Sequence, residues 1–218
     1  MELHADADFA GNWDPALAGD DVDTARSRHG YVLSFAGVPI IWKSQLQSEV
    51  ALSSTEAEVI GLSAALRTAI PIVNMVDEMA DLGFPILANQ REKQIHCKVF
   101  EDNSGALDMV RLPKMRPRTK HICVRMHHFR EHVRTGKVTI HKVPSRYQLA
   151  DIATKPQRRA LFESQRGSLM QWESEFRTRE ETGQAREHLR ACDIVNEVSR
   201  MTSLEGQPAP NPASPDST

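Results

Sequence analysis

Residues 53–73 read SSTEAEVIGLSAALRTAIPIV, and this stretch decides the fold. Its apolar residues recur at the three- and four-residue spacing of a helix that buries one face. Ser53 with Glu56, and Thr55 with Glu58, each match the capping box that begins many helices. The sequence therefore predicts a long helix that begins here and buries one side against the rest of the chain.

Two carboxylates near the start of this helix are expected to differ in role. Glu58 lies at the head of the apolar line that should face the core, which is formed by Leu62, Ala65, Leu66, Ala69 and Val73. A carboxylate on a buried line needs a partner, because burying an unpaired charge is costly. Glu56 lies instead on the line of Ser63 and Arg67. We therefore expect a functional role for Glu58 and a capping role for Glu56.

Strand-like and helix-like runs surround this stretch. Runs of alternating or β-forming residues predict strands at 3–9, 31–35, 38–42, 95–100 and 138–143, with a hairpin turn at 36–37. Helices are predicted at 53–82, with a kink or split at Pro71, and at 104–111, 119–135 and from Ser145 through Lys155. This order predicts an α/β fold built around one mixed sheet.

The composition of the chain predicts how it divides into segments and which class of protein it belongs to. Residues 1–172 are expected to form one domain, 173–202 a charged and marginally helical extension, and 203–218 a disordered tail rich in Pro and Ser. The chain is 40% hydrophobic and 26% charged, as soluble proteins are, and no apolar run reaches the length expected of a membrane span. Three widely spaced cysteines favour a reducing compartment, and the amino-terminal residues lack the pattern of a signal peptide.

Charge is unevenly distributed, although the net charge is only −2. The first residues are acidic, whereas the middle of the chain is basic, which suits a protein that holds cations beside phosphates. Around two prolines, four cations alternate with other residues, namely Lys114, Arg116, Arg118 and Lys120. In an extended segment they would share a face and could contact one phosphate strand. Solvated surface charge is the alternative for both features.

Four carboxylates are placed where strand and helix ends could bring them together, namely Asp6, Glu58, Asp102 and Asp151. Such a cluster repels itself unless cations join it, and oxygen ligands alone select hard ions such as Mg²⁺ or Mn²⁺. Each has an alternative role. Asp8 competes with Asp6 on the same strand face, Glu58 could cap its helix, Asp102 could cap the following helix, and Asp151 could pair with Lys155.

A histidine-rich segment offers a weaker alternative metal site. It contains His121, His127, His128 and His132. His128 and His132 share a helix face, but no paired cysteines or zincin spacing accompany them, so we expect nucleic-acid contact or exposed surface instead of zinc.

An ordered set of motifs in this chain resembles the ribonuclease H region of copia-type retrotransposon polyproteins. The motifs are Asp6 to Gly11 (DADFAG), Arg28 to Val32 (RHGYV), Ile41 to Ser44 (IWKS), Gln47 to Glu58 (QSEVALSSTEAE), Glu101 to Ala106 (EDNSGA), Arg118 to Ile122 (RTKHI) and Gln148 to Pro156 (QLADIATKP). They occur in the order of the family and cover roughly residues 3–170.

The resemblance implies a ribonuclease H-like fold, which is a five-stranded mixed sheet flanked by helices. It implies that Asp6, Glu58, Asp102 and Asp151 bind two Mg²⁺ ions, with Mn²⁺ as a substitute, and cut the RNA strand of an RNA–DNA hybrid during reverse transcription. It also implies a reverse transcriptase region in the full-length polyprotein and no membrane. The expected location is the cytoplasm, within a virus-like particle in an intact element, or the nucleus. The alternative is an inactive, domesticated or remnant module that binds nucleic acid without cutting it.

Overall fold

The structure is a computed structural model that describes residues 1–17, 19–87, 95–111 and 124–170. Several predictions fall on other residues. The charged extension at 173–202 and the tail at 203–218 lie outside the described residues. So do the four cations of the basic segment, Lys114, Arg116, Arg118 and Lys120.

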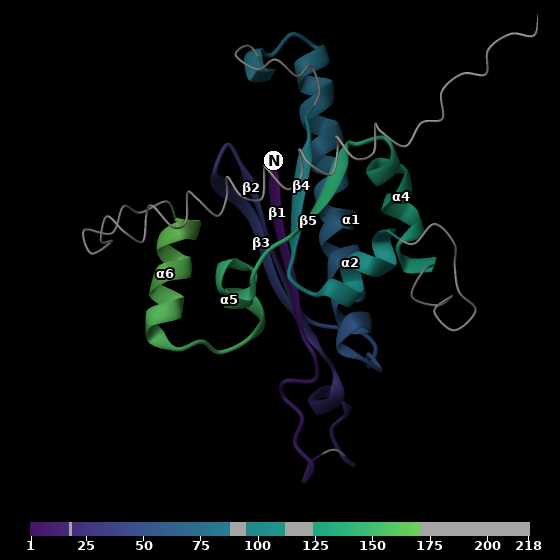
Figure 1. Ribbon diagram of the computed structural model, residues 1–218, viewed down its shortest axis with the longest axis vertical. Coiled ribbons are helices and arrows are strands. Elements are labelled where there is room, and N and C mark those ends of the chain that lie inside the picture. The colour runs from purple at the N-terminus through teal and green to yellow at the C-terminus, as the bar shows by residue number, and fades with distance from the viewer. Residues whose placement is uncertain (18, 88–94, 112–123, 171–218) are drawn as a thin grey trace, which may run out of the picture. The chain divides into compact units, whose positions relative to one another are not determined.

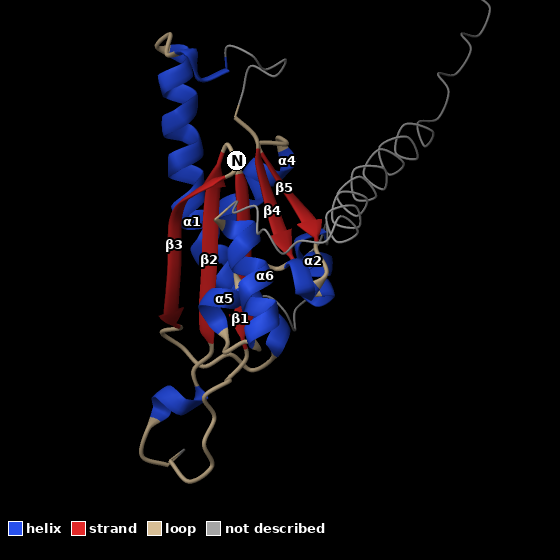
Figure 2. Cartoon of the chain, turned by 90° about the vertical axis from the view of Figure 1, so that its left-hand side faces the viewer, coloured by secondary structure: helices blue, strands red, loops and turns tan. Residues whose placement is uncertain are grey.

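The five strands form one mixed sheet (Figure 1), in the order β3-β2-β1-β4-β5 that Figure 2 shows. The strands are β1 (Glu2–Asp8), β2 (Arg28–Phe35), β3 (Val38–Leu46), β4 (Cys97–Glu101) and β5 (Val138–Lys142). β1, β2 and β3 pair antiparallel, whereas β4 pairs parallel with both β1 and β5. The predicted α/β fold with a five-stranded mixed sheet is therefore confirmed.

The hairpin between β2 and β3 turns where it was predicted, but its strands are longer than the apolar runs indicated. Ala36 (φ 49°) and Gly37 (φ 82°) both adopt the left-handed conformation that tight hairpin turns use. The pairing continues beyond Trp42, where polar residues follow, and ends with Arg28 opposite Leu46. The run of β-forming residues ends at Trp42, so it did not indicate that β3, at the edge of the sheet, continues to Leu46.

Helix α1 (Ser54–Asp81) forms one layer against the sheet and begins as predicted. The backbone N–H of Glu56 donates to Ser53 Oγ (3.1 Å), and the Leu52 N–H donates to Glu56 Oε2 (2.9 Å). The capping role expected for Glu56 is thus confirmed. Pro71 lies on the exposed side of an unbroken helix, so the predicted split is wrong.

The apolar line of α1 forms the centre of the core. Leu62 and Leu66 are fully buried with Leu3 of β1 and Leu33 of β2. By length and composition alone α1 could cross a membrane, with a mean hydropathy of 1.6 over an 18-residue window. Half of that window is buried within the protein, as in the core helix of a globular domain.

Helices cover both faces of the sheet (Figure 2). α1, α2 (Ser104–Arg111) and α4 (His127–Arg134) lie on one face, and α5 (Asp151–Thr154) and α6 (Arg159–Leu169) lie on the other. α2 was predicted and α6 was not. α4 lies within the helix predicted at 119–135, but a turn at Met126 interrupts that helix, and residues 119–123 lie outside the described residues.

The continuous helix predicted from Ser145 through Lys155 is wrong. A 3₁₀ turn at Ser145–Tyr147 is followed by the short helix α5. Tertiary hydrogen bonds replace the expected helical ones. The Ser145 hydroxyl donates to Asp102 Oδ2 (2.6 Å) instead of capping, and the buried Gln148 side chain donates to the backbone oxygen of Ala5 (2.8 Å).

α5 packs directly on β2 at Gly30. A Cβ atom at this position would lie 2.7 Å from Ala153 Cβ, 2.9 Å from Thr154 Cγ2 and 3.2 Å from the Lys43 oxygen. Contacts under 3.0 Å force a displacement, and both of these are to side-chain carbons of α5. A residue without a side chain is therefore required for α5 to approach the sheet this closely.

We predict that Gly30→Ala lowers the free energy of unfolding by about 1–3 kcal/mol, because the added methyl group overpacks the contact between β2 and α5. Urea denaturation measures the change. Gly19→Ala is the matched control, since nothing lies within 4 Å of a Cβ at Gly19. Equal stabilities of the two variants would contradict this description of the packing.

Candidate metal centre

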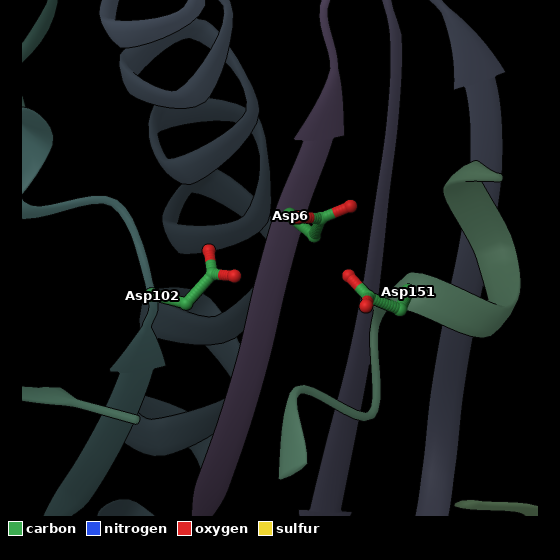
Figure 3. Close-up of side chains that lie close together, drawn as sticks. All are labelled: Asp6, Asp102 and Asp151. Atoms are coloured by element: carbon green, nitrogen blue, oxygen red, sulfur yellow. The ribbon is translucent and has the colours of Figure 1, made fainter. Parts of the chain in front are cut away.

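Five carboxylates converge at the end of the sheet where β1 and β4 finish. They fall into two groups, each with ligand atoms within 4.8 Å of one another: Asp6, Asp102 and Asp151, and Glu58, Glu101 and Asp102. Figure 3 shows the side chains of the first group together, on β1, after β4 and at the start of α5. The structure therefore brings together all four carboxylates selected from the sequence and adds Glu101.

Asp6 is held on the central strand and is only 1% exposed. The Thr154 hydroxyl of α5 donates a hydrogen bond to Asp6 Oδ2, which fixes the carboxylate toward the α5 side of the sheet. Asp8 points from the same strand but is only partly buried and belongs to neither group of carboxylates. The geometry thus favours Asp6 over Asp8.

Asp102 follows the last residue of β4 and belongs to both groups. The Ser145 hydroxyl holds Asp102 Oδ2 at 2.6 Å. Asp102 does not cap α2, since Asn103 Oδ1 accepts the hydrogen bond from the Ala106 N–H (3.0 Å). The capping alternative for Asp102 is therefore wrong, and its carboxylate is available to the cluster.

Asp151 begins α5 and takes part in both the pairing and the cluster that were considered as alternatives. Lys155 Nζ lies 2.9 Å from Asp151 Oδ1 and 3.6 Å from Asp6 Oδ1. Among the described residues, Lys155 is the one cation that forms an ion pair with any of the five carboxylates. One lysine cannot balance five carboxylates.

Gln148 bridges β1 and β4 beyond the point where the two strands stop pairing. β1 and β4 pair only as far as His4 and Phe100. Beyond that point, Gln148 Nε2 donates to the backbone oxygens of Ala5 (2.8 Å) and Phe100 (3.2 Å), and Gln148 Oε1 lies 3.0 Å from His4 Nδ1. One buried side chain thus bridges the two strands close to Asp6 and Asp102.

Burial and the charges of neighbouring carboxylates raise the pKa values of Glu58, Glu101 and Asp151. Burial, followed by the charges of Glu101, Asp6 and Asp102, raises the pKa of Glu58 to about 11. Burial and the charge of Asp6 raise the pKa of Asp151 to about 7. Burial also raises the pKa of Glu101 well above its usual value. Without a cation these groups retain protons, and a divalent ion would take the place of those protons.

The sequence prediction did not include Glu101, because the strand was expected to end at residue 100, one residue before it. In β4 the buried positions alternate, and Glu101 follows Cys97 and Val99 on the buried face. The argument that selected Glu58, a carboxylate on an apolar line, applies to Glu101 with a period of two instead of 3.6. Neither carboxylate group contains a histidine, so no described residues support the zinc alternative.

Comparisons with known sequences identify relatives of the chain. No protein-family model matches the chain. It is 35% identical over 163 residues to the retrovirus-related Pol polyprotein from transposon TNT 1-94 of Nicotiana tabacum. It is 32% identical over 166 residues to that from transposon RE1 of Arabidopsis thaliana. Each match covers 75% of this chain, so most of the chain is homologous to a segment of the retrovirus-related Pol polyproteins of transposons. The chain spans about a tenth of the length of these relatives (11% and 10%).

Solved structures with a similar arrangement include ribonucleases H. RNase H1 from Halobacterium salinarum has 18% sequence identity and a TM-score of 0.43. LC11-RNase H1 in complex with an RNA/DNA hybrid has 13% identity and a TM-score of 0.45. Both matches cover 70% of this chain and 92% of the other. Homology is shown by the polyprotein relatives.

We predict that metal-free protein loses stability as pH rises and that Glu58→Gln relieves the loss. The folded pKa of Glu58, about 11, lies above its usual 4.5, so above pH 4.5 the unfolded chain releases a proton that the folded protein keeps. Glutamine does not titrate. Between pH 5 and 8 the variant should gain at least about 1 kcal/mol relative to wild type, measured by urea denaturation in EDTA.

Glu78→Gln is the control, because Glu78 is an exposed glutamate of the same helix. It should follow the wild-type dependence on pH. Parallel curves for wild type and Glu58→Gln would show that Glu58 is not destabilised by its surroundings.

Proposed function

We propose that this chain is a metal-dependent ribonuclease that hydrolyses the RNA strand of RNA–DNA hybrids, as part of retrotransposon reverse transcription. The observation that carries the proposal is the convergence of carboxylates from β1, β4, α1 and α5 in a chain homologous to a segment of the Pol polyproteins. The proposed partners are the hybrid and a reverse transcriptase region of the full-length polyprotein.

The residues at the end of the sheet fit two divalent ions. The ligand atoms that these residues offer are carboxylate oxygens, which Mg²⁺ prefers and which Mn²⁺ also accepts. Glu58 Oε2 and Glu101 Oε2 are buried without hydrogen-bond partners, so among the described residues these two oxygens remain available to coordinate an ion. When bound, such ions supply an activated water and stabilise the leaving 3′ oxygen.

The protein's own contribution is to hold its ligands in place. Asp102 belongs to both carboxylate groups and would therefore link the two ion positions, and Ser145 fixes its orientation. Thr154 orients Asp6, and Lys155 holds Asp151 while adding positive charge beside the cluster. Because these supporting groups are already hydrogen bonded, little reorganisation is needed on binding.

Recognition of the hybrid is proposed to depend on shape, 2′-hydroxyl groups and phosphates, with little sequence preference. Lys114, Arg116, Arg118 and Lys120 are proposed to contact phosphates, which position a duplex without reading its bases. These four residues lie outside the described part of the chain, so their role stays a prediction from sequence.

The test is cleavage of a labelled RNA strand in a hybrid. Wild type should cut with Mg²⁺ or Mn²⁺ and stop when EDTA is added. Asp102→Asn should lower the rate by more than about 100-fold, since both ion positions lose a ligand and the remaining ligands are misplaced. Asp108→Asn, which removes an exposed carboxylate of α2, should leave the rate unchanged.

Two outcomes would contradict the proposal. Cleavage that persists in EDTA would remove the metal from the mechanism. If the wild-type protein binds the hybrid but does not cut it with either ion, the chain is instead an inactive module that binds nucleic acid.

A further inference from the structure

We propose that Glu101 is an additional metal ligand, which completes a cation position with Glu58 and Asp102 on the α1 side of the sheet. This position is separate from the one formed by Asp6, Asp102 and Asp151, although the two share Asp102. The inference rests on the metal dependence in the proposed function and goes beyond the four carboxylates that the family resemblance implies.

The fold places Glu101 and Glu58 on the same side of the sheet. Side chains alternate along β4, and Cys97 and Val99, which share a face with Glu101, belong to the core that packs against α1. Glu101 is 0% exposed and Glu58, on α1, is 6% exposed. Their carboxylate oxygens lie within 4.8 Å of each other and of Asp102, so one ion can contact all three.

Neither glutamate is neutralised by the protein around it. Glu101 Oε1 accepts a hydrogen bond from the Asn103 N–H (3.1 Å), but Glu101 Oε2 and Glu58 Oε2 are buried without a partner. Lys155 forms its ion pairs with Asp6 and Asp151, and no described cation forms an ion pair with Glu58 or Glu101. Two unpaired buried carboxylates side by side are costly, and a divalent ion between them removes that cost.

The competing explanation is that Glu101 only stabilises the turn after β4 through Asn103. The two explanations predict different results when a glutamine amide replaces the carboxylate of Glu101. Glutamine keeps an oxygen that can accept the Asn103 N–H, but it lacks the charge that a metal ligand provides. Glu101→Gln should therefore preserve the turn and lose the ligand.

Isothermal titration calorimetry measures how many Mn²⁺ ions the full chain binds and with what affinity. Wild type should bind two ions. Glu101→Gln should lose one, or bind it at least about tenfold more weakly, and Glu78→Gln should match wild type. Asp151→Asn should weaken the other ion instead. Thermal unfolding in EDTA checks that each variant folds. If Glu101→Gln does not fold, Glu101→Asp, with its shorter reach, should show the same loss.

The outcomes separate this inference from the proposed function. If wild type binds two Mn²⁺ ions and cuts the hybrid while Glu101→Gln binds two with unchanged affinity, Glu101 is not a ligand and the function stands. If Glu101→Gln loses one ion but wild type does not cut, the ligand assignment stands and the function fails. Wild type that binds no Mn²⁺ overturns both.

Discussion

Mutual repulsion among five carboxylates, gathered where β1 and β4 end, is the constraint on which the rest of this structure depends. Four of them are at most 6% exposed, and among the described residues Lys155 is the one cation that forms ion pairs with these five carboxylates. An arrangement of this kind weakens the metal-free fold, because each carboxylate must keep a proton or face another charge. It persists because packing on both faces of the sheet holds the chain in place.

The sheet divides the cluster into two groups. α1 brings Glu58 to one side, where Glu101 lies, and α5 brings Asp151 to the other, where Asp6 lies. Asp102 stands beyond the end of β4 and belongs to both. This arrangement depends on the gap between the two parallel strands, which Gln148 bridges through backbone oxygens on each.

The sequence predicted those parts of this arrangement that depend on local periodicity. The start of α1, the capping by Glu56 and the burial of Glu58 follow from the capping box and a 3.6-residue repeat, and all three are observed. Tertiary contacts decided the rest. Ser145 binds Asp102 and Gln148 binds two strands, so the helix expected there is replaced by a 3₁₀ turn and a four-residue helix. The choice between capping and cluster for Asp102 depended on Asn103, whose side chain takes the capping role.

We propose that the end of this sheet binds two divalent cations, each held by three carboxylates. Anomalous diffraction from crystals grown with Mn²⁺ tests it most directly, because each manganese ion gives its own peak. We expect two peaks, one among Asp6, Asp102 and Asp151 and one among Glu58, Glu101 and Asp102. A structure without manganese at these carboxylates would contradict the proposed two-ion site.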